Sequence, residues 1–232
     1  MKTLGLLGGM SWESTLTYYK IINETVQAEL SGLHSAKILL YSVDFDEIER
    51  LQSAGRWDDC AAILTDAAKR LEAAGADFLV ICTNTLHKVA PEIQARVSIP
   101  LLHIAKATAR ELRKAGVSAV GLLGTSYTLT QDFYTEVLRT AGLDVLIPED
   151  EAIRTLDAII FGELCRGNVR EESGQEILRM IERLKSRGAQ GVVLGCTELG
   201  LLVRPGDVEI PVFDTALIHA QAAALASLRD SF

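Results

Sequence analysis

The apolar residues of this chain fall into short continuous runs that alternate with longer stretches of helical periodicity. Residues 2–7 form an apolar run that leads into glycines, and residues 12–30 then place apolar side chains at helical spacing. An apolar run closed by a glycine turn and followed by a helix is typical of a buried parallel strand. Because the alternation continues to the end of the chain, we predict an α/β fold with parallel sheets.

The same pattern predicts the other elements. Ser11 and Asp214 are expected to cap the helices that follow them. Residues 44–54 form a short helix or loop, and Pro100 limits its strand to a short or edge position. A short helix is expected to start at Thr197 and to end before Pro205. Further strands are expected at 36–43, 78–82, 97–102 and 143–147, and further helices at 56–74, 86 onward, 103–115, 128–141, 150–166, 171–187 and 214 onward.

Three blocks of sequence occur twice, in the same order. General alternation of strand, glycine and helix explains the glycines, but not Arg-Leu-x-x-x-Gly-Ala followed by a matched strand and a polar loop. We therefore predict two similar Rossmann-like lobes related by a pseudo-twofold axis: residues 1–102 with 214–232 form the N-terminal lobe, and residues 103–213 the C-terminal lobe. The paired blocks are 4–10 with 120–126, 70–85 with 183–198, and 99–105 with 210–216.

The repeat also predicts where a ligand binds. In open parallel sheets, ligands lie beyond the carboxyl ends of the strands. Four loops follow the strands of the repeated blocks, and we expect them to converge on one cleft between the lobes. These loops are residues 8–12, 83–87, 124–128 and 195–199.

The composition of the chain argues against several classes of function. The chain has 232 residues and a net charge of −8, which argues against a nucleic-acid or anionic-membrane surface. No apolar run approaches the ~18–20 residues that span a bilayer. The four cysteines have no CxxC spacing, so a metal or iron–sulfur site has little support. The start of the chain matches a first strand better than a signal peptide, so a cytoplasmic location is expected.

One cysteine stands in a position suited to chemistry. Cys196 follows a predicted buried strand and precedes a predicted short helix, whose N-terminus favours the thiolate over a thiol of ordinary pKa ~8.5. The repeat pairs Cys196 with Thr83. Cys82 lies one residue earlier, on the strand, and is expected in the core. Two proton-transfer groups at equivalent points suit racemisation, which needs a base on one face of a carbon and an acid on the other.

These motifs together resemble the aspartate/glutamate racemase family, and most of all its branch of broad-specificity amino-acid racemases. The resemblance runs nearly end to end and rests on Gly8–Met10, Thr83–Thr85 with His87 beyond, and Gly195–Glu198. It implies racemisation without a cofactor by two bases, in a two-lobed fold that is usually a dimer. The family carries a cysteine in each loop. Here the second is Cys196, whereas Thr83 occupies the first position.

The resemblance assigns roles to the loops. Cys196 deprotonates the L-amino acid and Thr83 serves the opposite face, directly or by relay, so we expect a bias toward L-substrates. His87 either tunes Thr83 or makes structural hydrogen bonds, and Arg170 keeps a cation found in aspartate racemases. The loop after the second strand lacks the expected arginine, which favours a neutral or broad substrate range over strict Asp/Glu specificity. The substrate-binding residues are expected to be Met10, Gln52, Asn84, Thr85, Thr125, Thr197 and Glu198.

Three alternatives stay open at this point. A hydantoin racemase or a cysteine-dependent decarboxylase or isomerase would use the same lobes. A non-catalytic amino-acid sensor would explain the missing first cysteine. A nucleotide-binding protein is the third, because Gly5–Gly9 resembles the start of a dinucleotide site, with Asp44 as the acidic ribose ligand.

Overall fold

A computed structural model describes residues 1–204 and 206–229 of the chain. The fold divides into two compact units: unit 1 comprises Met1–Ile104 and the chain from His219 onward, and unit 2 comprises Ala105–Ile218. Pro205, the expected limit of the short helix after Cys196, lies outside the described residues, as do residues 230–232 of the expected N-terminal lobe.

Unit 1 is built on a parallel sheet of four strands in the order β2-β1-β3-β4. At its centre, Leu6 of β1 pairs with Leu40 of β2 and Val80 of β3. The central strands β1 and β3 are almost entirely buried, whereas the edge strands are partly exposed. The strands are β1 (Thr3–Gly8), β2 (Lys37–Ser42), β3 (Phe78–Ile81) and β4 (Leu101–Leu102).

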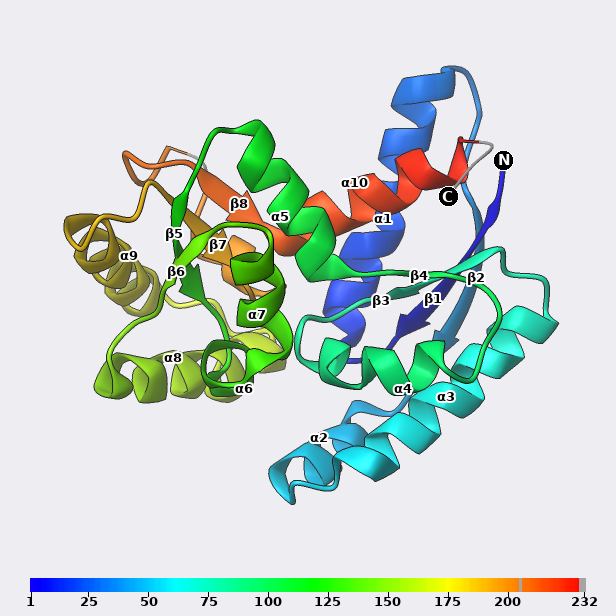
Figure 1. Ribbon diagram of the computed structural model, residues 1–232, viewed down its shortest axis with the longest axis horizontal. Coiled ribbons are helices and arrows are strands. Elements are labelled where there is room, and N and C mark those ends of the chain that lie inside the picture. Colours follow the sequence, from blue (N-terminus) through cyan, green and yellow to red (C-terminus); the bar gives the residue numbers. More distant parts are fainter. Residues whose placement is uncertain (205, 230–232) are drawn as a thin grey trace. The chain divides into compact units, whose positions relative to one another are not determined.

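Helices cover both faces of this sheet, with α3 on one side and α1 with the later part of α10 on the other (Figure 1). Only strands buried on both faces read as continuous apolar runs, which explains the opening pattern of the chain. The helices of unit 1 are α1 (Trp12–Leu30), α2 (Phe45–Ser53), α3 (Trp57–Ala73), the 3-10 helix η1 (Thr85–Val89), α4 (Ala90–Gln94) and most of α10 (Thr215–Ser227).

The face under α3 shows how the sequence pattern becomes a core. Leu7, Leu79 and Ile81 point from the sheet into a buried cluster with Leu64 and Leu71 of α3. All five are at most 3% exposed. Burial of each such side chain contributes ~1.5–3 kcal/mol relative to exposure, so this cluster fixes β1 and β3 against α3. The loops that leave these two strands therefore start from a rigid base.

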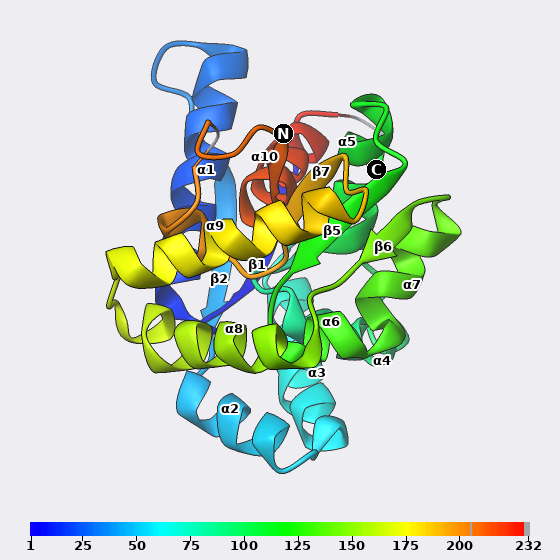
Figure 2. The same cartoon turned by 90° about the vertical axis from the view of Figure 1, so that its left-hand side faces the viewer.

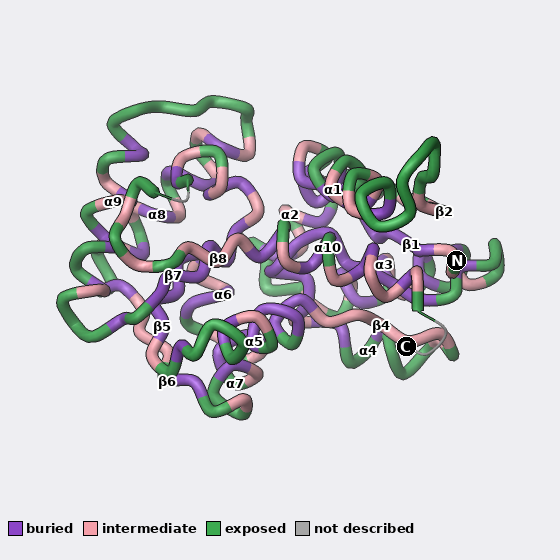
Figure 3. Tube along the Cα trace, turned by 90° about the horizontal axis from the view of Figure 1, so that it is seen from above, coloured by how far each residue is buried: buried purple, intermediate pink, exposed green. Residues whose placement is uncertain are grey.

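Unit 2 repeats the architecture with a parallel sheet in the order β6-β5-β7-β8. Figure 3 shows its central strands β5 and β7 buried, as in unit 1. Leu122 of β5 pairs with Val193 of β7, and Val193 pairs in turn with Phe213 of β8. The strands are β5 (Ala119–Leu123), β6 (Asp144–Leu146), β7 (Gly191–Leu194) and β8 (Val212–Asp214).

The helices of unit 2 again pack on both faces of the sheet. Figure 2 shows α8 and α9 alongside each other in front of the sheet. On the other face, Tyr134 of α7 donates a 3.3 Å hydrogen bond to Thr108 of α5. These helices are α5 (Ile104–Lys114), α6 (Ser126–Thr130), α7 (Asp132–Thr140), α8 (Asp150–Gly162), the 3-10 helix η2 (Leu164–Arg166), α9 (Glu171–Ser186) and the 3-10 helix η3 (Leu199–Leu201).

The two sheets confirm that the sequence repeat is a repeat of structure. The four strands occur in the same order in both units, with the first strand of each set between the second and the third. The third strands, Phe78–Ile81 and Gly191–Leu194, keep the offset of 113 residues at both ends. The prediction of an α/β fold with two parallel sheets is therefore correct.

Several elements differ from the sequence prediction, and in two cases one expected helix ends in or begins with a 3-10 helix: α8 is followed by η2, and η1 precedes α4. The helix expected at 128–141 is two helices, because Gln131 has extended backbone angles between α6 and α7. The strand expected at 97–102 is only Leu101–Leu102, which follows Pro100 at the edge of the sheet. The short helix after Cys196 starts at Leu199 and not at Thr197. Among the described residues, no helix is both long enough and apolar enough to cross a bilayer.

Candidate functional site

The candidate residues lie at the carboxyl ends of the central strands in each unit. In unit 1, the loops after β1 and β3 are neighbours, since the Cys82 amide donates to the Leu7 carbonyl at 2.9 Å. In unit 2, the loops after β5 and β7 are neighbours in the same way, and the Gly195 amide donates to the Leu123 carbonyl at 2.6 Å. Each unit therefore has one pair of adjacent polar loops, and the convergence of all four loops on one cleft stays a prediction.

The first loop of each pair has the same capped turn. Ser11 caps α1 by accepting from the Ser14 amide at 3.4 Å, and its hydroxyl lies 3.2 Å from that of Ser14. Thr125 caps α6 by accepting from the Thr128 amide at 3.4 Å, again with 3.2 Å between the hydroxyls. Such caps contribute ~1 kcal/mol each. In α6 the amide of Ser126 is bonded as well, since it donates to Asp157 Oδ1 at 2.8 Å. The expected capping role of Ser11 is confirmed, and Thr125 has the same role.

Glycine at position 9 is required by the path of the chain in the first loop. Gly9 has φ +92°, and a side chain there would collide with the backbone of Val43. Its amide donates to the Thr15 hydroxyl at 2.9 Å. Met10 follows, with its side chain 3% exposed in the core cluster. A contact between substrate and the Met10 position is therefore expected from its backbone.

The second loop of unit 1 carries Thr83, Asn84 and Thr85, all of which are at least 91% buried. The loop leads into η1, and the His87 amide donates to the Asn84 carbonyl at 3.0 Å. The ring Nδ1 of His87 lies 2.8 Å from the carbonyl oxygen of Thr83. His87 therefore binds the main chain of Thr83, which is the structural role left open by the sequence.

The second loop of unit 2 holds the thiol against a carboxylate. Cys196 is 8% exposed and Glu198 is 6% exposed. The Cys196 thiol donates to Glu198 Oε2 at 3.0 Å, and the Thr197 hydroxyl donates to the same oxygen at 2.8 Å. One carboxylate oxygen thus accepts from both residues that precede it. A carboxylate within hydrogen-bond distance of a thiol has the geometry of a general base that can take the thiol proton.

The expected acidic thiol is not found. Burial raises the pKa of the Cys196 thiol well above its ordinary value, and the negative charge of Glu198 and then the electrostatic interaction with Cys165 raise this pKa further. The helix that was expected to favour the thiolate is η3, a 3-10 helix of three residues that begins only at Leu199. Cys196 is therefore a neutral thiol at neutral pH. Formation of the thiolate requires transfer of its proton to Glu198 or to another base.

Gln52 has an unusual environment for a polar side chain. It lies in α2 and is 4% exposed. Its amide Nε2 is buried, and within the described chain it has no hydrogen-bond partner. A buried unpaired donor costs ~1–3 kcal/mol. Such a donor can bind an acceptor such as a carboxylate or hydroxyl oxygen, and the substrate contact predicted for Gln52 stays a prediction.

The remaining candidates have structural partners. Cys82 directly follows the last residue of β3 and is fully buried, so the prediction of a core residue is correct. Burial raises the pKa of its thiol. Asp44 accepts from the Asp46 amide at 3.1 Å and caps α2. Asp214 caps α10 by accepting from the Ala216 amide at 2.8 Å. Arg170 is exposed and pairs with Glu163 at 3.6 Å.

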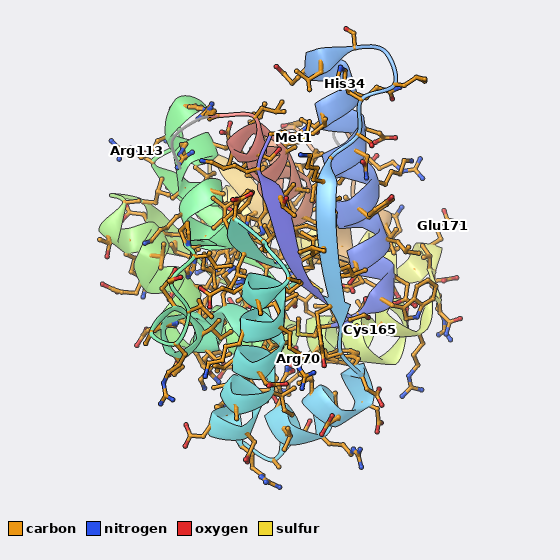
Figure 4. All side chains as sticks on the ribbon, turned by 90° about the vertical axis from the view of Figure 1, so that its right-hand side faces the viewer. Met1, His34, Arg70, Arg113, Cys165 and Glu171 are labelled. Carbon is orange, nitrogen blue, oxygen red and sulfur yellow. The ribbon has the colours of Figure 1, made fainter. Side chains whose placement is uncertain are left out.

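Several buried polar groups had no clear signal in the sequence. Tyr18 and His219 are fully buried and hydrogen-bonded to each other at 2.8 Å, although 201 positions separate them. Glu13 Oε2 and Gln131 Oε1 are buried without a hydrogen-bond partner among residues 1–204 and 206–229. Cys165, labelled in Figure 4, lies in η2 close enough to act electrostatically on Cys196. Only tertiary contacts reveal these groups.

Among the described residues, no three His, Cys, Asp or Glu side chains gather in a group that could hold a metal ion. His87 and His219 are bound to main-chain groups, and Glu198 is bound to Cys196 and Thr197. The donor sets of both loops are thus suited to proton transfer and to the binding of a small polar molecule.

Comparisons with known proteins find similar sequences and structures over nearly the whole chain. The sequence profile described as Asp/Glu/hydantoin racemase matches residues 7–223. The broad specificity amino-acid racemase RacX of Bacillus subtilis is 25% identical over 94% of this chain and 95% of its own. A Yersinia pestis protein proposed to be an Asp/Glu racemase is 51% identical, with a TM-score of 0.92 over 99% of this chain and 100% of that one. An aspartate racemase homologue from Pyrococcus horikoshii is 40% identical, with a TM-score of 0.87 over 99% and 100% of the two chains.

Proposed function

Because the chain belongs to the Asp/Glu/hydantoin racemase family, we propose that it is an amino-acid racemase that works without a cofactor by transferring the Cα proton between two faces of the substrate. Cys196 is the base toward the L-amino acid, and Thr83 serves the opposite face. The single observation that carries this proposal is the buried hydrogen bond from the Cys196 thiol to Glu198, at 3.0 Å. A thiol paired with a base is the usual form of an activated cysteine.

The proposed reaction of an L-substrate balances as a chain of proton transfers. The Cys196 thiol gives its proton to Glu198, and the resulting thiolate removes the Cα proton of the L-amino acid. The Thr83 hydroxyl then delivers a proton to the other face of the carbanion while it takes one from water. Glu198 finally gives its proton to the hydroxide that this water leaves behind, so that Cys196, Glu198 and the water regain their starting states.

The two faces are proposed to be unequal in strength. A thiolate is a competent base at accessible pH, whereas a threonine hydroxyl does not ionise near neutrality. Deprotonation of an L-substrate by Cys196 is therefore faster than deprotonation of a D-substrate on the Thr83 side. We expect a strong bias toward L-amino acids as substrates.

The proposed substrate range is broad, centred on amino acids with polar side chains. The similarity to RacX supports a broad range, and the family supports Asp and Glu as members of it. The unpaired amide of Gln52 offers a neutral donor to the ligand. Arg50, the nearest arginine in that sequence region, pairs with Asp46 at 3.1 Å on the surface. Backbone amides at Met10 and Thr125 and the polar groups of Asn84, Thr85 and Thr197 complete the proposed substrate contacts.

The deciding experiment follows Cα deuterium incorporation in D2O over a panel of L- and D-amino acids, with chiral separation of the products. Wild-type protein is expected to exchange L-substrates, and Cys196→Ala is expected to lose at least a thousandfold of that rate. Cys60→Ala is the matched control, because Cys60 is a fully buried core cysteine. Binding of amino acids without any exchange would indicate a sensor, and full turnover by Cys196→Ala would refute the catalytic role of that residue.

We further propose a homodimer that forms through the exposed face of α1. Trp12, Leu16 and Tyr19 lie one helical turn apart and are 61%, 57% and 53% exposed. A continuous apolar stripe of this kind is uncommon on a monomer and marks an interaction surface. In an antiparallel, twofold pairing about Leu16, Trp12 of one copy lies opposite Lys20 of the other, where a cation–π contact is available. This complementarity favours a second copy of the chain as the partner.

A further inference from the structure

Three histidines gather inside unit 1, although they come from three separate segments. The ring centroids of His87 and His103 are 4.7 Å apart, and those of His87 and His219 are 5.6 Å apart. His87 is 1% exposed and His219 is fully buried. Buried imidazoles at this distance disfavour one another's charged forms. Burial therefore favours the neutral forms of His87 and His219.

The partners of His87 fix one neutral tautomer. Its Nε2 lies 3.1 Å from the Ile104 amide, which can only donate, so Nε2 is the acceptor. Its Nδ1 lies 2.8 Å from the Thr83 carbonyl oxygen, which can only accept, so Nδ1 carries the proton. Burial, then the charges of His103 and His219, lower the pKa of His87 well below its ordinary value. Both nitrogens are thus occupied by main-chain groups, and neither serves the Thr83 hydroxyl.

The partners of His219 fix the opposite tautomer. Its Nε2 lies 2.8 Å from the Leu102 carbonyl oxygen and therefore donates. Its Nδ1 then accepts from the Tyr18 hydroxyl at 2.8 Å. The rings of Tyr18 and His219 meet edge to face, with centroids 5.6 Å apart. One histidine thus holds the carbonyl of residue 102 and the other holds the amide of residue 104.

These hydrogen bonds lie where the chain leaves and re-enters unit 1. The polypeptide leaves unit 1 after Ile104 and re-enters it at His219. The cluster therefore joins the segments where the chain leaves and re-enters unit 1 to the loop that carries Thr83. The bonded residues are distant in sequence: 17 positions separate His87 from Ile104, and 117 separate His219 from Leu102. The two hydrogen bonds of His87 therefore restrain the Thr83 main chain from outside its own loop.

We infer that His87 is a positioning residue, which sets the orientation of Thr83 by holding its carbonyl oxygen and anchoring it to the Ile104 amide. This role rests on the proposed function, since it matters for catalysis only where Thr83 acts on a substrate. It differs from a proton relay, because the ring exchanges no proton during the reaction. Loss of the ring is expected to disturb the Thr83 face of the reaction and to spare the Cys196 face.

The first test measures two rates on one L-substrate in D2O: Cα exchange with retention, which needs only Cys196, and inversion, which also needs Thr83. His87→Leu keeps an apolar side chain but removes both hydrogen bonds. His87→Gln keeps one donor and one acceptor in its amide. We expect His87→Leu to lower the ratio of inversion to exchange at least tenfold, and His87→Gln to recover most of that ratio. Equal loss of both rates, or no recovery in His87→Gln, would overturn the inference.

The second test needs no variant and no activity. In 15N NMR of the wild-type protein with labelled histidine, one imidazole is expected to remain the neutral, Nδ1-protonated tautomer from pH 8 to pH 5. A spectrum in which every histidine is Nε2-protonated, or titrates near its ordinary pKa, would contradict the assignment. Absence of Cα exchange in the wild-type protein would instead refute the proposed function and leave this tautomer result standing.

Discussion

The Cys196 thiol and the Glu198 carboxylate share a buried hydrogen bond of 3.0 Å, two residues apart on the loop after β7. The same carboxylate oxygen also accepts from the Thr197 hydroxyl. The arrangement both raises the pKa of the thiol and provides a group to receive its proton. The carboxylate therefore opposes formation of the thiolate in the resting protein, and in the proposed mechanism it accepts the thiol proton.

These two effects separate in the variant Glu198→Gln. Removal of the negative charge is expected to lower the pKa of Cys196, because the neighbouring charge no longer opposes the thiolate. Racemisation is expected to fall by about 10²–10⁴-fold, the usual contribution of a general base. The pH dependence of alkylation by iodoacetamide measures the thiol pKa, and Cα exchange measures activity. A pKa that does not fall, or activity that stays at the wild-type level, would count against the assigned pair.

Thr83 is expected to limit reactions that start from D-amino acids. Thr83→Cys places an ionisable thiol on the loop after β3, at the position that the repeat pairs with Cys196. We expect Cα exchange from D-substrates to rise at least tenfold, while exchange from L-substrates changes little. Thr83→Ser, which keeps a hydroxyl and adds no base, is the matched control. A D-substrate rate that is the same in all three proteins would remove Thr83 from the mechanism.

Gln52 is expected to show that a binding group costs stability. Its Nε2 is a buried donor without a partner in residues 1–204 and 206–229, so Gln52→Leu should leave the free energy of unfolding unchanged or raise it by about 1 kcal/mol. The KM is expected to rise roughly tenfold or more, because a hydrogen bond to a charged group contributes ~1.5–3 kcal/mol. Urea denaturation and initial rates test the two parts. A destabilised variant with an unchanged KM would mean that Gln52 is only structural.

The sequence was sufficient for the parts of the fold that depend on local pattern. Both faces of β3 and β7 are covered, so these strands appear as apolar runs, and the repeat fixed their equivalence to the residue. The helix predicted at Trp12–Leu30 has those bounds in α1. The break at Gln131 was missed because no glycine or proline marks it, and its extended backbone is visible only in the structure.

The candidate site also has a part that the sequence could predict and a part that it could not. Thr83, Cys196 and Glu198 follow from loops at strand ends, which a sequence motif can locate. The high pKa of Cys196 could not be predicted, because it depends on burial and on the rotamer that brings Glu198 to the thiol. The bond between Tyr18 and His219 spans 201 positions, and neither residue lies in a motif. Such partners are set by packing of α1 against α10, so they appear only once the fold is known.

The exposed stripe on α1 predicts the oligomeric state. Leu16→Glu is expected to convert a dimer to a monomer, because it places two like charges at the centre of the proposed twofold interface. Leu33→Glu is the matched control, since Leu33 is fully exposed in the loop after α1 and lies outside the stripe. Sedimentation velocity at micromolar concentration measures both variants. A wild-type monomer, or a Leu16→Glu dimer, would refute this surface.

His219 predicts a specific loss of stability in acid. Burial lowers the pKa of His219 from 6.5 to about 3. Below pH 6.5 the imidazole of His219 is therefore protonated in the unfolded chain but stays neutral in the folded protein. The contribution of the neutral ring to the free energy of unfolding is complete above pH 6.5 and declines as the pH falls toward 3. The decline is ~1.4 kcal/mol per pH unit for each such histidine, or roughly 2 kcal/mol between pH 6.5 and pH 5.

The variant His219→Gln isolates this contribution, because its amide offers a donor for the Leu102 carbonyl and an acceptor for the Tyr18 hydroxyl but does not titrate. Urea denaturation at pH 7.5 and pH 5 is expected to give a smaller loss of unfolding free energy for the variant than for the wild type. The carboxylates titrate alike in both proteins, so the difference between the two losses belongs to His219. Equal losses would mean that the histidine is protonated in the folded protein or that its folded pKa is close to its unfolded one.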